Sequence, residues 1–122
     1  MVRLRVDPLS EAAREASVFE YGSGFSTQWW ERHAASVDAV QHDAGWAKQV
    51  EQRLGNRATL RHIELDYGGE YCRAILAAEK RYEVVVVDGR DRVNCVKFAL
   101  QRLRRRRDYL RQQPATEIPT WH

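Results

Sequence analysis

Short apolar runs alternate along the chain with segments whose apolar residues recur at helical spacing. Four runs are typical of strands: 17–21, 36–40, 58–65 and 84–87. Four segments between or after them favour helices: 26–34, 43–54, 70–78 and 91–103. The run at 58–65 alternates apolar and polar residues, as an edge strand does, whereas Val84 to Val87 have no polar break, which is typical of a strand buried on both faces of a parallel sheet. This regular succession predicts an α/β fold, with a doubly wound parallel sheet and right-handed crossovers.

The same pattern predicts how the helices begin and which residues they bury. Ser26 or Thr27 is expected to cap the first helix, and Asp43 the second. Trp29, Trp30 and Trp46 are expected on helix faces that pack on the sheet. The last helix is expected to begin at a capping Asp91. Four of its apolar residues have helical spacing and are expected to face the core: Val93, Val96, Leu100 and Leu103.

Length and composition indicate one globular domain. The chain has 122 residues, of which 43% are hydrophobic and 30% charged. No apolar run is long enough to span a membrane, and the first residues do not resemble a signal peptide, so a cytoplasmic protein with no membrane partner is expected. Cys72 and Cys95 form neither a disulfide framework nor a metal-binding pair, and the four histidines lack ligand spacing. We therefore expect no metal site.

The basic charge is concentrated at one end of the chain. Residues 102–122 hold six of the 20 basic residues and two of the 17 acidic ones, which leaves 14 basic and 15 acidic residues in 1–101. A near-neutral body argues against a nucleic-acid-binding face on the domain. The expected organisation is an N-terminal segment with a short helix (1–16), the α/β domain (17–103) and an irregular, Arg-rich tail (104–122).

Polar residues and glycines gather where the predicted strands end. In a doubly wound sheet the ligand crevice lies at the carboxyl ends of the strands. The stretch FEYGSGFSTQWW (19–30) places Glu20, Gly22 and Gly24 there, just before a helix. Such glycines serve either a tight turn or a close approach to a ligand. The third glycine of a dinucleotide fingerprint is replaced by Thr27, and no phosphate-binding Lys-Ser/Thr pair follows.

Four segments carry a more specific signal: FEYGSGFSTQWW, VDAVQHDAGW, GGEYCRAI and YEVVVVDGRDRVNC. Together they resemble the class I S-adenosylmethionine-dependent methyltransferases, closest to a bacterial branch with an E-x-G-S-G-x-S-T loop. The resemblance covers about residues 18–100. It implies a Rossmann-like sheet with strand order 3-2-1-4, S-adenosylmethionine as cofactor, and methyl transfer to an acceptor that the sequence does not identify.

The resemblance also implies roles for residues of the first loop. Gly22 and Gly24 would line the methionine part of the cofactor, and Glu20 would position its ammonium group. The loop residues Ser23, Ser26 and Thr27 belong to the same implied site.

The other implied site residues follow the later strands. The acid that normally accepts hydrogen bonds from the ribose is replaced by Gln41, and Asp43 is expected to compensate in part. Asp66 is a candidate for the adenine amine, although the favoured interpretation is a turn residue before Gly68 and Gly69. Asp88 would lie beside the reacting methyl group as the candidate catalytic base, with His42 as the alternative and a further cofactor contact.

The family fold continues with further strands after the helix that precedes the Arg-rich tail. The resemblance therefore implies a truncated domain, which need not be active. In that case Val84–Val87 would present an open strand edge, and an edge-strand homodimer or aggregation is expected. If the arginines of the tail use CGN codons, a shift of one nucleotide from Arg104 permits the strand-like string A-G-G-V-I-I-C-D-N-S. We therefore hypothesise an out-of-frame tail, which sequencing of the gene tests.

Two other functions stay open at this level. The first is a binding protein whose basic tail contacts nucleic acid or an acidic partner, although the tail has only Tyr109 and Trp121 as aromatic residues for base stacking. The second is a nicotinamide-dependent enzyme, which Thr27 and Gln41 disfavour. Small-molecule or unknown methyl acceptors are the partners that the leading interpretation implies.

Overall fold

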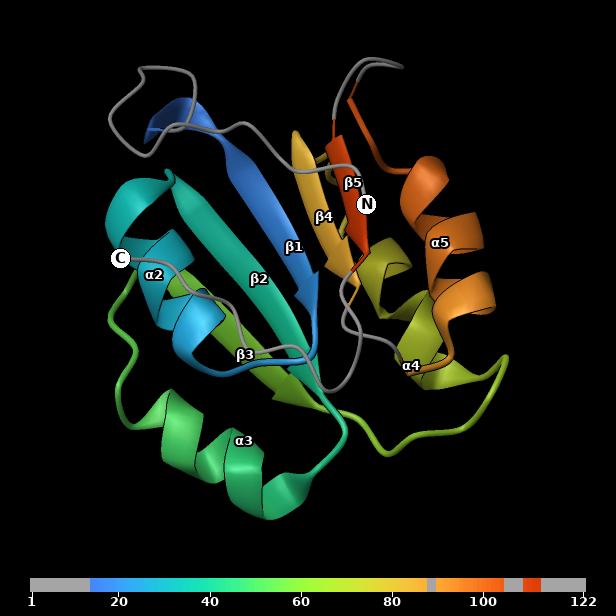
Figure 1. Cartoon of the computed structure of the whole chain (residues 1–122), viewed down its shortest axis with the longest axis horizontal. Helices are drawn as coiled ribbons and strands as arrows, with labels where there is room; N and C mark the ends of the chain where they lie inside the picture. Colours follow the sequence, from blue (N-terminus) through green and yellow to red (C-terminus); the bar gives the residue numbers. More distant parts are fainter. Residues whose placement is uncertain (1–13, 88–89, 105–108, 113–122) are drawn as a thin grey trace.

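The computed structural model describes residues 14–87, 90–104 and 109–112 (Figure 1). Its strands are β1 (Ser17–Tyr21), β2 (Ser36–Gln41), β3 (Ala58–His62), β4 (Val84–Val87) and β5 (Tyr109–Gln112). Its helices are α2 (Phe25–His33), α3 (Ala44–Glu51), α4 (Glu70–Arg73), the 3-10 turn η1 (Ala74–Leu76) and α5 (Arg92–Leu100). All described strands pair in parallel, in the order β3-β2-β1-β4-β5.

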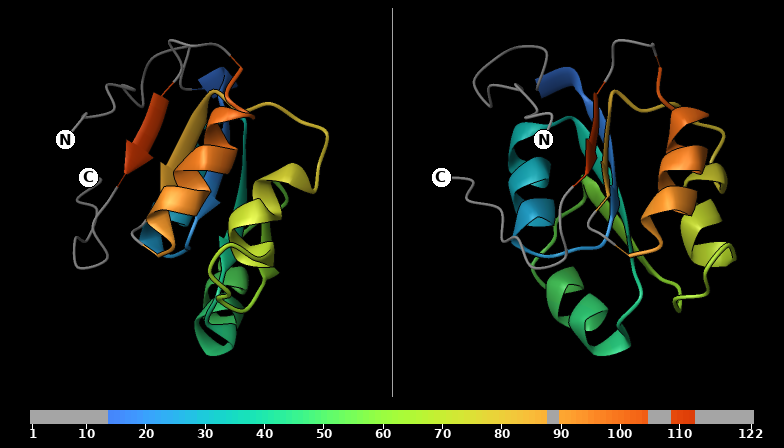
Figure 2. Two further views of the ribbon diagram at one scale, coloured as in Figure 1. Left: turned by 90° about the vertical axis from the view of Figure 1, so that its right-hand side faces the viewer. Right: turned by 45° about the vertical axis from the view of Figure 1, so that its right-hand side comes forward.

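The predicted α/β class and the 3-2-1-4 order of the first four strands are confirmed. Helices α2 and α3 cover one face of the sheet, whereas α4 and α5 cover the other (Figures 1 and 2). Trp29 and Trp30 of α2 are buried against the first face, as predicted. Val84–Val87 are at most 2% exposed, because β4 is central and has apolar neighbours on both faces.

The expectation of a wholly irregular tail and an open β4 edge is wrong. Tyr109–Gln112 form β5, which pairs with β4 from Val84↔Tyr109 to Val87↔Gln112. The side-chain pattern of the tail did not indicate this strand, but strand pairing is made by backbone groups, which the unpaired side of β4 would otherwise leave without partners. The basis for a homodimer through that edge is therefore removed. The remainder of the tail and residues 1–13 of the N-terminal segment lie outside the described residues.

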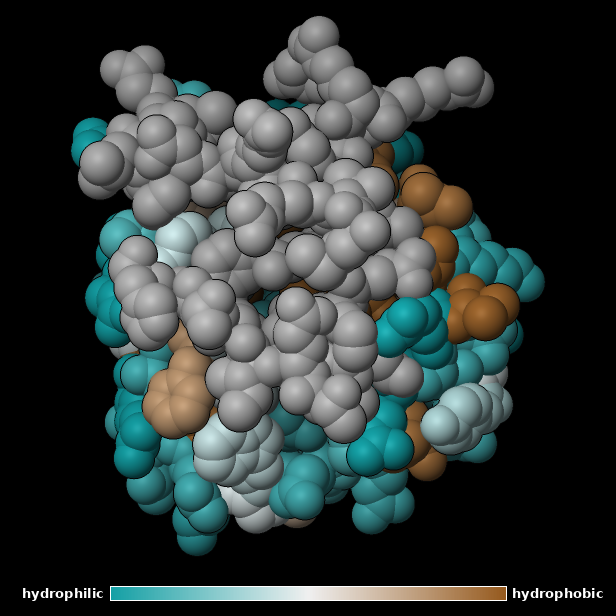
Figure 3. Space-filling model, viewed as in Figure 1, coloured by the Kyte–Doolittle hydropathy of each residue, from teal (hydrophilic) through white to brown (hydrophobic). Residues whose placement is uncertain are grey.

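One expectation about helices is also wrong, and a second is wrong for two of its four residues. Gly24, rather than Ser26 or Thr27, is the N-cap of α2. The buried residues of α5 are Cys95, Phe98 and Ala99. The expectation holds for Leu103, which is buried beyond the end of α5, and for Val96, which is partly buried against the core. Val93 is 82% exposed and Leu100 is 60% exposed, and apolar side chains are visible on that side of the molecule (Figure 3). Two neighbouring stripes of apolar residues on α5 have helical spacing. The stripe that contains Phe98 is buried, because the Phe98 ring fills the space beside the sheet.

None of the helices in the described part of the chain is both long and apolar enough to cross a lipid bilayer.

Candidate ligand site at the carboxyl ends of the strands

The loop between β1 and α2 turns sharply at its first glycine. Gly22 has φ +99°, a conformation that favours glycine, and its N–H donates to the carbonyl of Val40 at 2.7 Å. The chain then enters α2 directly after Gly24. The first amide groups of a helix lack carbonyl partners one turn earlier in the helix, so this turn brings the N–H donors at the start of α2 to the carboxyl edge of the sheet.

A buried carboxylate lies beneath this loop. Glu20 of β1 is 2% exposed and accepts hydrogen bonds from the hydroxyls of Ser26 and Thr27. The Thr27 hydroxyl in turn accepts from Gly24 N at 3.1 Å. The structure therefore brings together four residues that the sequence implied, and the positive end of the α2 dipole favours a negative charge here.

Gln41 joins this loop to the next one. It is 5% exposed, and its Nε2 donates to Ser23 Oγ at 2.9 Å. Its Oε1 accepts from the backbone N–H groups of His42 (2.9 Å) and Asp43 (3.1 Å). Trp46 Nε1 adds a bond of 2.8 Å to the Ser23 carbonyl. The loops after β1 and β2 are therefore held together as one surface. The Gln41–Ser23 contact that joins them links residues 18 positions apart.

Asp43 and Trp46 have roles that differ in part from those expected. Asp43 Oδ1 accepts from Trp46 N at 2.9 Å, which confirms its prediction as the cap of α3. Trp46 does not pack on the sheet: it is 38% exposed, and a Cβ added at Gly24 would lie 3.6 Å from its ring. The indole therefore forms a wall of the loop surface.

His42 and Asp66 lie farther along the same edge. The half-buried His42 ring lies 5.9 Å from that of Tyr71, and its carbonyl is 3.2 Å from His62 Nε2. Asp66 is exposed in the connection after β3, where its carbonyl accepts from Gly69 N at 2.8 Å. This geometry is that of a turn. Because β3 neighbours β2 and not β1, Asp66 is separated from the Glu20 loop by one strand.

Asp88, the candidate base, lies outside the described residues. Asp91, three residues later, is 5% exposed with φ +47°. Its carboxylate accepts from Gly68 N (2.9 Å) and from Asn94 Nδ2 (2.8 Å), so it joins the β3–α4 connection to the start of α5. The sequence suggested Asp91 only as a cap, and its side chain makes no capping bond to the helix backbone.

The buried thiol and phenol groups near this edge are structural. Burial, followed by the nearby Asp91 carboxylate, raises the pKa of the Cys72 thiol. Burial also raises the pKa of Tyr21, whose hydroxyl donates to the Cys72 carbonyl at 2.6 Å. Cys72 and Cys95 are both fully buried. The raised pKa of Cys72 and the burial of both thiols fit small core residues rather than nucleophiles.

In the described ranges, no group of three His, Cys, Asp or Glu side chains could hold a metal ion. No family model, curated protein or solved structure matches the chain significantly.

The two glycines of the loop should respond differently to the same substitution. Gly22→Ala should lower the free energy of unfolding by about 1–2 kcal/mol, because a Cβ is unfavourable at positive φ. Gly24→Ala is the matched control: its backbone is extended at φ 161° and the new Cβ makes ordinary contact with Trp46, so a change below about 0.5 kcal/mol is expected. Urea denaturation measures both. Equal costs would contradict the assigned turn.

Proposed function

We propose that the chain is an S-adenosylmethionine-dependent methyltransferase-type domain that transfers a methyl group to an acceptor still to be identified. The observation that carries the proposal is the buried Glu20, held by Ser26 and Thr27 under the Gly22–Gly24 turn. This arrangement lies at the carboxyl end of β1, whose neighbours β2 and β4 mark the point where the winding of the sheet reverses.

The residues of the loop suit the cofactor's charged part. Glu20 supplies a negative charge for an ammonium group, and the amides at the start of α2 supply donors for a carboxylate. A methionine moiety carries both groups. The adenosine part would then extend toward Gln41 and His42. When bound, S-adenosylmethionine supplies a methyl group on a sulfonium, and transfer depends mainly on how the protein orients the acceptor. Asp88 is the proposed base for an acceptor that must lose a proton.

Calorimetric titration with S-adenosylhomocysteine, S-adenosylmethionine and NAD tests the proposal. We expect the first two to bind and NAD to bind at least about tenfold more weakly. Gly24→Val should abolish binding, because its methyl groups would crowd the loop beside Trp46, whereas Gly45→Ala in α3 should not. Absence of binding by the folded wild-type protein, or preferential binding of NAD, would contradict the assignment.

Gln41→Glu should tighten S-adenosylhomocysteine binding about threefold to tenfold, since an acid makes charge-assisted bonds to ribose hydroxyls. The structure accommodates the added charge: the oxygen at this position already accepts two backbone N–H bonds, and Ser23 can donate its hydroxyl instead of accepting. The same titrations measure this effect. Unchanged affinity would show that Gln41 serves only to join the two loops.

A further inference from the structure

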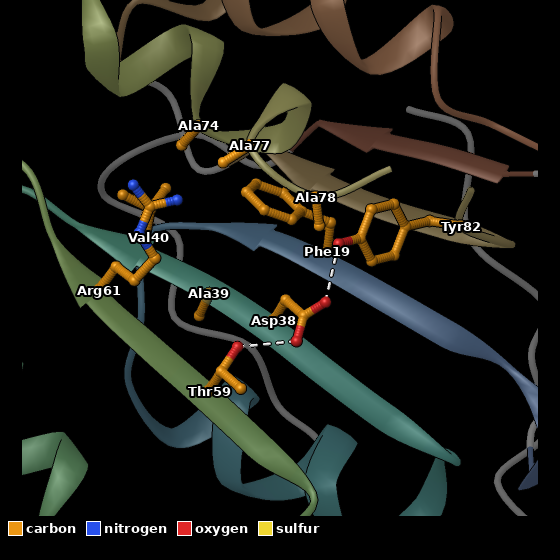
Figure 4. Close-up of a pocket in the computed structure, with 10 residues that line it drawn as sticks. All are labelled: Phe19, Asp38, Ala39, Val40, Thr59, Arg61, Ala74, Ala77, Ala78 and Tyr82. Carbon is orange, nitrogen blue, oxygen red and sulfur yellow. Dashed lines mark hydrogen bonds between the residues drawn. The ribbon is translucent and has the colours of Figure 1, made fainter. Parts of the chain in front are cut away.

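A cavity of about 340 Å³ opens on the sheet face that carries α4 (Figure 4). It lies over β1, β2 and β3, beside η1. It is lined by Phe19, Asp38, Ala39, Val40, Thr59, Arg61, Ala74, Ala77, Ala78 and Tyr82. Helix α4 and η1 are short and pack on Tyr21, Phe19 and Val85, so that part of the sheet beyond them is left uncovered.

One end of the cavity is polar and fixed in place. The Asp38 carboxylate accepts from Thr59 Oγ1 at 2.7 Å, from Tyr82 OH at 2.7 Å and from Lys80 Nζ at 3.1 Å. Although burial acts to raise it, these hydrogen bonds hold the pKa of Asp38 below its ordinary value. Asp38 is therefore charged at neutral pH. The hydroxyl oxygens of Thr59 and Tyr82 keep lone pairs that can accept a further bond.

The other end carries a basic group. Arg61 extends from β3, and its guanidinium end lies beside Val40 (Figure 4). Lys80 and Asp38 form an ion pair at the polar end, so their charges largely cancel. The exposed Arg61 leaves the cavity with a net positive charge. An anionic group is therefore favoured at this end.

The middle of the cavity is apolar and includes aromatic rings. Phe19 and Tyr82 form an edge-to-face pair with ring centroids 5.4 Å apart. Val40 lies on the same sheet face, and three alanines of and after η1 leave room opposite them: Ala74, Ala77 and Ala78. Small side chains above a floor that contains an aromatic ring suit a flat ring, and the volume lies within the usual range for small-ligand sites.

We propose that this cavity binds a monocyclic aromatic carboxylate that carries a hydroxyl group opposite the acid. The ring lies between Phe19 and the alanines, the carboxylate binds Arg61, and the hydroxyl bonds to the Asp38 end. This site is distinct from the proposed cofactor site: Glu20, Ser26 and Thr27 lie on the α2 face of the sheet, whereas Phe19 and Asp38 face α4 and η1.

The test is calorimetric titration of the full chain with 4-hydroxyphenylacetate and two analogues. We expect 4-hydroxyphenylacetate to bind, and its neutral amide to bind about tenfold more weakly because the charge-assisted bond to Arg61 is lost. Phenylacetate, which lacks the hydroxyl, should bind about threefold to tenfold more weakly. Equal binding of acid and amide would overturn the proposal, as would no binding of the acid at roughly 10 mM.

Variants locate the binding. Arg61→Gln should weaken binding of the acid about tenfold without changing that of the amide. Arg57→Gln is the matched control, an exposed arginine outside the cavity, and should have no effect. Ala77→Leu, at an exposed wall position, should abolish binding by filling the space. Amide NMR shifts should centre on Val40 and Ala77; shifts centred on Gly22–Gly24, or equal effects of the two arginine variants, would overturn the assignment.

Discussion

Removal of residues 105–122 should lower the free energy of unfolding by about 2–4 kcal/mol and cause the chain to associate. The deletion removes β5, and Val84–Val87 then lose the backbone hydrogen bonds on one side at a net cost of about 1 kcal/mol each. Alternate residues of this buried strand then have unpaired N–H and C=O groups, which form a template for a second chain. Urea denaturation and sedimentation velocity measure the two effects.

A shorter deletion is the matched control. Removal of residues 113–122 keeps β5 intact, so it should leave the free energy of unfolding and the oligomeric state close to those of the whole chain. If both deletions behave alike, or if the longer one leaves a stable monomer with protected Val84–Val87 amides, the pairing of β5 with β4 contributes nothing in solution.

Asp38→Ala should destabilise the fold by about 2–3 kcal/mol. The carboxylate accepts from three donors, and Tyr82 is 1% exposed, so its hydroxyl would be left without this partner in a buried position. Tyr82→Phe removes one donor and should cost about 1 kcal/mol. The double variant should cost less than the sum of the two, because both changes break the same bond. Full additivity, measured by urea denaturation, would show that the bond is not formed.

The same carboxylate predicts a pH dependence. The folded-state pKa of Asp38 lies below its ordinary value, so its contribution is complete above about pH 4 and is lost as the pH falls from there through the folded pKa. The wild-type protein should therefore lose more stability between pH 7 and pH 3 than Asp38→Asn does. Parallel slopes for the two proteins would contradict the assignment of a low pKa to Asp38.

Much of the fold could be predicted because it depends on local patterns. The pattern predicted Val84 to Val87 as a buried strand and 58–65 as an edge strand. The first is confirmed, and the second is confirmed as the edge strand β3, which ends earlier, at His62. Asp43 read as a helix cap and is one. The sequence did not show which side of α5 is buried, since Val93 and Phe98 are both apolar. Only the shape of the space beside β4 and α4 places Phe98 in the core and Val93 at the surface.

In the candidate site, too, contacts between residues close in sequence could be predicted and long-range contacts could not. The residues Glu20, Gly24, Ser26 and Thr27 are close in sequence, so a strand-loop-helix turn brings them together. The roles of Gln41 and Trp46 at Ser23 were not foreseen, because their contacts cross between two loops. The sequence indicated Asp91 only as a helix cap. Its bond to Gly68 could not be predicted, since the two residues are 23 positions apart.

The sequence alone determined the alternation of strands and helices and the loop that follows β1, because each depends on residues close together in the chain. The parallel sheet could be predicted from that alternation, since strands joined by helical crossovers pair in parallel. The tertiary structure decided what long-range contacts control. It paired β5 with β4 despite the charged tail, since backbone groups pair whatever side chains they carry. It also placed Asp38, Thr59 and Tyr82 in one cluster. These residues are up to 44 positions apart, and only the packing of β2, β3 and the segment before β4 brings them within hydrogen-bonding distance.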